Sequence, residues 1–163
     1  MEALHALAAR RCVRRFKNEP VSRDAIVRLI DAARLAPTAR NVQPWEFVVV
    51  TDPSKRRQLA ALTDHGKFIA EAPVCIVVLS HDTKYYLEDG SAATTNILLA
   101  AAAQGLGACW VAGDKKAYAP QVVSLCGAPT ELKLVSLVAV GHPAETPAPS
   151  KRSIEDVLHW EAF

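Results

Sequence analysis

The chain of 163 residues has the length of one domain, and its apolar share of 50% and charged share of 22% are those of a soluble globular protein. The formal net charge of +2 is too small to indicate nucleic acid or a membrane as the partner of the whole chain. The four cysteines, Cys12, Cys75, Cys109 and Cys126, show no CxxC spacing, and the N-terminus has no basic n-region, so we expect reduced thiols and a cytoplasmic location.

Helix and strand signals alternate along the chain. The pattern predicts five helices and four strands: helices at residues 2–10, 23–35, 53–62, 89–104 and 121–126, and strands at 46–51, 74–80, 108–112 and 134–141. Ser22 and Asp52 are typical N-caps, and a polar tail from Pro143 ends with one expected helical turn near residues 153–160. The sequence therefore predicts a single α+β domain.

The segment at residues 96–113 is nearly uncharged but does not read as a membrane span. It is somewhat short for a bilayer, and the Gly105-Leu106-Gly107 break divides it. We interpret it as a buried helix that ends with Gly105 as its C′ residue, followed by a core strand. The helix at 89–104 is apolar almost all round, so we expect a second subunit to cover part of it.

The stretch "RRCVRRF" places Arg10, Arg11 and Arg14 where a short helix is expected to end. Arginine forks suit phosphate, although a solvated basic surface explains the same charges. Lys151 and Arg152 form a second basic pair, which on its own indicates only an exposed tail. Nucleic-acid binding is a weaker hypothesis, because no aromatic residues alternate with these charges.

The loop before the first strand carries Thr38, Asn41 and Gln43 directly ahead of Pro44 and Trp45. Its amide side chains could form hydrogen bonds with the edge of a flat heterocycle, or with backbone groups of the turn itself. "GLGACWVAG" is not a Rossmann fingerprint, and by spacing alone it is a helix cap and core strand. The five histidines show no metal-ligand spacing and no nucleophile elbow is present, so metalloenzyme and hydrolase hypotheses are weak.

Taken in order, four segments resemble the nitroreductase family of flavin enzymes. They are "RRCVRRF", "APTARNVQPWEFVVVTDPSK", "NILLAAAAQGLGACWVAG" and "VAVGHPAETPAPSKRSIEDVLHW", which together extend over nearly the whole chain. The resemblance implies a nitroreductase-like α+β fold with a mostly antiparallel sheet flanked by helices, in an intertwined homodimer. It implies one FMN-binding domain over residues 1–163, with the tail at 143–163 packing on the partner subunit.

The same resemblance implies FMN as cofactor at the subunit interface, and a ping-pong reaction. NADH or NADPH would be the donor, and a nitroaromatic, quinone or similar small molecule the acceptor. Two alternatives stay open: a flavin-binding sensor or store without turnover, and a family offshoot with other flavin chemistry such as dehalogenation. The short "GDKKAYAPQ" segment leaves little cover over the flavin, so the acceptor stays open. The choice between NADH and NADPH also stays open.

Site residues carry over from the resemblance one at a time. The residues implied to bind FMN are Arg10, Arg11, Cys12, Arg14, Pro37, Thr38, Asn41, Gln43, Val111, Ala112, Gly113, Lys151 and Arg152. Arg10, Arg11, Lys151 and Arg152 would hold the phosphate and ribityl chain, and Arg14 would raise the reduction potential from the pyrimidine end. The loop residues would come from the opposite subunit, with Trp45 behind them. Cys12 replaces the family's usual serine and is a weaker hydrogen-bond donor. No acid–base side chain is expected, since the flavin carries the chemistry.

Overall fold

The computed structural model describes residues 2–163 and confirms the predicted α+β fold. The helices are α1 (Ala3–Ala9), α2 (Arg23–Arg34), α3 (Pro53–Leu62), α4 (Tyr86–Ala103) and α5 (Ala119–Leu125), and the strands are β1 (Trp45–Val50), β2 (Val74–Ser80), β3 (Gly107–Ala112) and β4 (Lys133–Gly141). Two short 3-10 turns, η1 (Ala39–Asn41) and η2 (Lys67–Ala70), join them. The largest difference from the sequence-based bounds is at α4, which begins three residues before Asp89.

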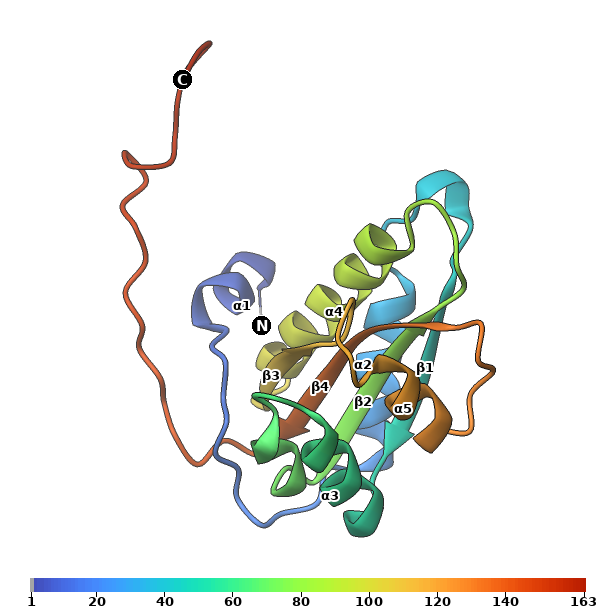
Figure 1. Ribbon diagram of the computed structural model, residues 1–163. Helices are drawn as coiled ribbons and strands as arrows, with labels where there is room; N and C mark the ends of the chain where they lie inside the picture. The colour runs from blue at the N-terminus through green and yellow to red at the C-terminus, as the bar shows by residue number, and fades with distance from the viewer. Residues whose placement is uncertain (1) are drawn as a thin grey trace.

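The four strands form one antiparallel sheet in the order β1-β2-β4-β3. All seven residues of β2 are buried, and so are all residues of β4 after Lys133. Helices α2 and α4 cover one face of the sheet, and α3 and α5 cover the other (Figure 1). Covered faces on both sides explain why the central strands are continuous apolar runs rather than alternating ones.

The predicted helix caps are confirmed. The Ser22 hydroxyl accepts a hydrogen bond from the Ala25 N–H at 3.2 Å, and the Asp52 carboxylate accepts one from the Lys55 N–H at 2.7 Å. Gly105 ends α4 with φ of +72°, a conformation that glycine adopts without strain. The caps and the glycine fix where each helix begins or ends.

Arg56 of α3 has a buried structural role that the sequence did not reveal. Its guanidinium is buried and donates hydrogen bonds to the carbonyls of Ala70, at 3.0 Å, and of Ala72. Burial lowers the pKa of Arg56 from its usual value. These bonds hold α3 against η2, the turn that borders the candidate site.

Helix α1 and the C-terminal tail lie outside the body of the domain, and the tail runs away from it as an extended arm (Figure 1). A single turn lies where the final helical turn was expected, and in it the Leu158 N–H donates to the Ile154 carbonyl at 2.9 Å. Both segments expose large apolar side chains: Leu4, Leu7, Ile154, Val157, Leu158, Trp160 and Phe163. Among residues 2–163, no helix has the length and apolarity needed to cross a bilayer.

Candidate functional site

The basic N-terminal segment lies against the outer edge of β3. Cys12 pairs with Ala108 in an isolated parallel bridge, and the Val13 N–H donates to the Ala108 carbonyl at 3.1 Å. A Cβ on Gly107 would lie 2.8 Å from the Val13 Cβ, so the second glycine of "GLG" permits this close approach. Two motifs that are far apart in the sequence are therefore neighbours in the structure.

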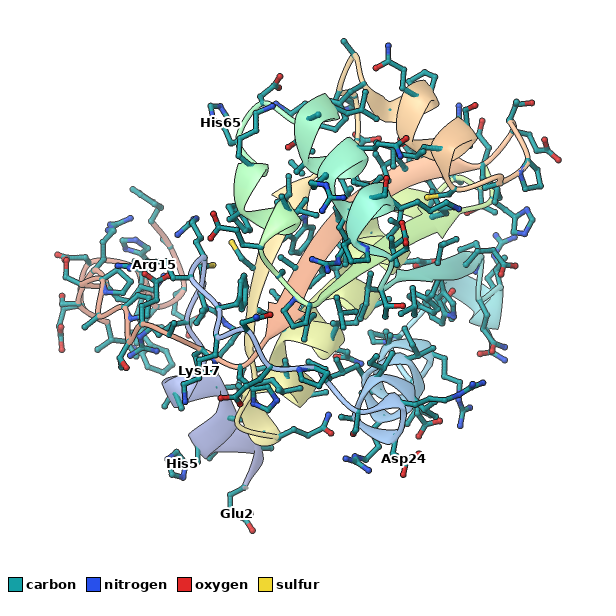
Figure 2. All side chains as sticks on the ribbon, turned by 90° about the horizontal axis from the view of Figure 1, so that it is seen from below. Glu2, His5, Arg15, Lys17, Asp24 and His65 are labelled. Carbon is teal, nitrogen blue, oxygen red and sulfur yellow. The ribbon has the colours of Figure 1, made fainter. Side chains whose placement is uncertain are left out.

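The start of the tail fixes this segment from its other side. The Lys17 N–H donates to the His142 carbonyl at 2.8 Å, and the Ala144 N–H donates to the Arg15 carbonyl at 2.9 Å. One carboxylate oxygen of Glu145 accepts both the Arg14 N–H, at 2.7 Å, and the Arg15 N–H, at 3.1 Å. Figure 2 shows Arg15 and Lys17 on the side of the molecule where the tail also lies. A charged acceptor on two successive amides sets the position of the Arg14 backbone.

A cavity of about 160 Å³ opens beside Arg14. Its lining residues are Arg14, Asp64, His65, Phe68, Cys109, Trp110, Val111, Ala112, Lys116 and Tyr118. The Arg14 guanidinium carbon lies 5.9 Å from the centre of the Phe68 ring, a cation–π distance. The structure thus brings Arg14 together with Val111 and Ala112, and it adds side chains from the turn after α3 and the loop before α5.

Two polar contacts hold the loop at residues 113–118 over this cavity. The Tyr118 hydroxyl donates to the Ala112 carbonyl, and the Lys116 ammonium lies 3.4 Å from the Asp64 carboxylate. Burial raises the pKa of Tyr118, and the charge of Asp64 adds to that shift. Tyr118 is therefore a neutral hydrogen-bond donor near pH 7, and it keeps the short loop closed against β3.

The outer edge of β3 is free beside the cavity. Ala108 turns its carbonyl toward Val13, so the alternation of a strand turns the backbone groups of Trp110 and Ala112 to the same side. Within residues 2–163 the N-terminal segment pairs with β3 only at Cys12, and no other strand borders this edge. The cavity thus combines outward backbone N–H groups of β3, the Phe68 ring, the Arg14 guanidinium and the ion pair of Lys116 with Asp64, a set suited to the polar edge of a flat heterocycle.

The loop before β1 is held by one buried carboxylate. Thr38 donates its hydroxyl hydrogen to Asp89 at 2.8 Å, the Ala39 N–H donates to the same carboxylate at 3.2 Å, and the Thr38 hydroxyl accepts the Gln43 N–H at 3.1 Å. Arg40, Asn41 and Gln43 have φ of +54°, +56° and +53°, which is strained for residues other than glycine. The Asn41 and Gln43 side chains remain exposed.

This loop does not meet the N-terminal segment within one chain. Asp89 is in the first turn of α4, whereas Ala102, near its end, borders a second cavity together with Arg10. At about 1.5 Å per residue, the two places are roughly 20 Å apart along the helix. Pro37, Thr38, Asn41 and Gln43 are therefore separate from Arg10. The basic pair of the tail lies on an exposed arm.

Of the remaining predicted site residues, Arg10 and Arg11 line the second cavity, and Gly113 follows the last residue of β3. Arg11 donates to the Ala8 carbonyl at 2.6 Å and so caps the end of α1. Arg10 lies 3.8 Å from the Cys12 sulfur. A Cβ on Gly113 would lie 2.5 Å from the Leu134 side chain, so this glycine is required for packing at the end of β3.

A profile described as "Nitroreductase family" matches residues 7–66 and 63–142. The chain belongs to the nitroreductase family. A relative from Methanothermobacter thermautotrophicus, provisionally named NADH dehydrogenase/NAD(P)H nitroreductase, is 30% identical over 100% of this chain and 88% of its own. A provisionally named nitroreductase from Desulfovibrio desulfuricans, solved in complex with FMN, superposes with a TM-score of 0.89 at 32% identity and covers 100% of this chain and 98% of its own. An iodotyrosine deiodinase of Thermotoga neapolitana is 26% identical over the full length of both chains.

The position of Glu145 in this nitroreductase-family chain generates a first prediction. Glu145→Ala removes a charged acceptor from two amides, which should lower the free energy of unfolding by roughly 1.5–3 kcal/mol. Hydrogen exchange should speed up at the Arg14 and Arg15 amides, as measured by NMR. The exposed Glu131→Ala is the matched control and should change neither quantity. Unchanged exchange at both amides would show that Glu145 does not hold the segment in solution.

Proposed function

We propose that this chain is an FMN-dependent oxidoreductase that transfers electrons from NADH or NADPH to a nitroaromatic, quinone or similar small acceptor. The observation that carries the proposal is the cavity where the Arg14 guanidinium faces the unpaired edge of β3. Family membership and the relative in complex with FMN support it.

The residues at this cavity fit FMN. The outward N–H groups of Trp110 and Ala112 would hold the polar edge of the ring, and Arg14 would lie at its pyrimidine end. Arg10 and Arg11, with Lys151 and Arg152, would hold the phosphate and ribityl chain. Bound FMN would supply the redox chemistry between the nicotinamide donor and the acceptor. The protein's part is then orientation and electrostatic field.

The size of the cavity argues for a site shared by two chains. About 160 Å³ is below the roughly 300–1,000 Å³ of an ordinary ligand pocket. The polar loop before β1, which lines no part of this cavity in one chain, would complete the pocket when supplied by a partner. Pro37, Thr38, Asn41 and Gln43 would then contact the flavin from the opposite subunit. Homodimerisation is thus part of the proposed function.

The C-terminal tail of each chain would bind the other chain and so hold this dimer together. A groove of about 610 Å³ runs between α2 and the edge strand β1. Its lining residues are Val21, Arg23, Ile26, Val27, Ile30, Asp31, Arg34, Val49 and Thr51. The exposed apolar residues of the partner's tail, Trp160 among them, would bury themselves on such a surface and cover an open sheet edge.

The deciding experiment is an anaerobic reduction. The purified protein, supplied with FMN, should be yellow and should bleach with NADH or NADPH, and a nitroaromatic or quinone should restore the colour. Bound FMN that stays yellow with both donors would point instead to a sensor or store. Iodotyrosine should be offered to the bleached protein as well, because of the deiodinase relative. Recolouring by iodotyrosine alone would replace the proposed acceptor class with a dehalogenation substrate.

Arg14 should tune the flavin more than it anchors it. Reduced FMN carries more negative charge at the pyrimidine end than oxidised FMN, so the contact with Arg14 differs between the two forms. Arg14→Gln should keep most of the affinity for oxidised FMN and lower the reduction potential, by about 30 mV for each 1.4 kcal/mol lost. The measurement is a dye-linked redox titration, with the adjacent Arg15→Gln as control. Loss of FMN with an unchanged potential would make Arg14 an anchor instead.

Arg152 should act on the phosphate alone. Arg152→Ala should weaken FMN binding by about ten- to a hundred-fold, the loss of a charge-assisted hydrogen bond, and should leave riboflavin binding nearly unchanged. Flavin fluorescence titration measures both constants. The exposed Arg57→Ala is the control for a general loss of positive charge. Equal losses for FMN and riboflavin would show that Arg152 does not contact the phosphate.

Removal of the tail should convert the dimer into a monomer with little affinity for FMN. A chain that ends at Ala148 lacks the exposed apolar residues that we assign to the partner's groove, whereas a chain that ends at Glu161 keeps Trp160. Sedimentation at micromolar concentration should give a monomer for the first and a dimer for the second. A full-length chain that sediments as a monomer would contradict the shared site itself.

A further inference from the structure

Two cysteines from distant parts of the chain meet beside the candidate site. The bridge between Cys12 and Ala108 places Cys12 next to Cys109, the following residue of β3. The Cys12 thiol is close enough to raise the pKa of Cys109, and Cys109 also lines the cavity beside Arg14. Cys12 is partly exposed, whereas Cys109 is 1% exposed. Solvent can therefore reach the Cys12 thiol, whereas the Cys109 thiol is buried.

We propose that Cys12 and Cys109 are a redox modification site that closes to a reversible disulfide when a hydroperoxide oxidises Cys12. The pairing of Cys12 with Ala108 holds the backbone of Cys12 at a position next to that of Cys109. The guanidinium of Arg10, 3.8 Å from the Cys12 sulfur, places a positive charge beside the attacking atom.

The reaction balances with hydrogen peroxide as oxidant. The Cys12 sulfur attacks one peroxide oxygen, so that an S–O bond forms, the O–O bond breaks, and the leaving hydroxide takes the thiol proton to become water. The Cys109 sulfur then attacks the sulfenic sulfur of Cys12. The S–S bond forms, the S–O bond breaks, and the second hydroxide leaves as water with the proton of Cys109. The two thiols give up two electrons, and the peroxide becomes two waters.

The environments of the two thiols set the order of these steps. Burial, and then the neighbouring Cys12, raise the pKa of Cys109 to about 12, although Arg14 and Arg10 act in the opposite direction. A buried sulfur that keeps its proton is a poor first attacker, since the thiolate is the nucleophile. Cys109 is suited instead to resolve a sulfenic acid that forms within hydrogen-bond reach.

The pair also has a consequence for the cofactor, which rests on the proposed function. Cys12 is one of the residues assigned to FMN, and Cys109 borders the cavity proposed for its ring. Bound FMN should therefore shield Cys12 from peroxide. The disulfide would in turn fasten the N-terminal segment to β3 beside Arg14 and remove the Cys12 thiol from contact with FMN.

The test uses the full chain freed of flavin and treated with one equivalent of hydrogen peroxide. Intact mass spectrometry should show a loss of about two hydrogen masses, and a non-reducing peptide map should join the peptides of Cys12 and Cys109. Titratable thiols should fall by two and return with dithiothreitol. Cys126→Ser, as control, should behave in the same way as the parent for this pair. Cys12→Ser should form no such bond, and its exposed position leaves folding intact.

Three results would overturn the proposal: a persistent sulfenic or sulfinic acid on Cys12 with no disulfide, the same mass loss in Cys12→Ser, or a peptide map that joins other cysteines. A second arm repeats the oxidation with FMN bound, where closure should slow several-fold. Equal rates of disulfide formation with and without bound FMN would show that FMN does not shield Cys12. The flavin-free arm alone decides whether the disulfide forms. A protein that fails to bind FMN would contradict the proposed function and leave the first arm fully decisive.

Discussion

The antiparallel sheet of four strands has two edges, and the rest of the molecule is organised around how each one is covered. On the β3 edge, a single backbone pairing at Val13 and the carboxylate of Glu145 fix a basic segment. Beyond that pairing, the edge stays open beside Arg14, which creates the candidate site. On the β1 edge, the open strand borders an apolar groove. Unpaired edges are hazards for aggregation unless something covers them, and the proposed dimer would cover one with FMN and the other with the partner's tail.

The length of α4 sets the second constraint. A helix of 18 residues separates the loop at its start from Arg10, near its end, by roughly 20 Å. Within one rigid chain, this loop and Arg10 therefore stay apart. Two chains related by symmetry can bring them together, because the start of one helix can approach the end of the other. This separation supports the proposed assembly, and the small cavity of the single chain is consistent with half a site.

The sequence predicted the elements of this fold well and its contacts poorly. Buried strands, N-caps such as Ser22 and the terminating Gly105 are local patterns, so they could be read without coordinates. Arg56 looked like a surface residue of α3, and only tertiary structure could reveal its carbonyl acceptors. Phe68 and Tyr118 could not be assigned to the cavity from the sequence either. Their proximity to Arg14 is a tertiary contact, which the local pattern of their own segments does not encode. The contact between Cys12 and Cys109 depends on strand pairing and has no signature in cysteine spacing.

The loop before β1 shows why two opposed interpretations of a polar stretch can both hold. Thr38 satisfies the backbone of its own turn through Asp89, as the purely structural interpretation predicts. Because that one buried carboxylate holds the strained backbone, the Asn41 and Gln43 side chains stay at the surface in a fixed frame. A ligand that binds such a loop has less conformational entropy to remove than one that must order it. The strain at three left-handed residues thus favours a preformed binding surface, and Asp89 is the residue on which its geometry depends.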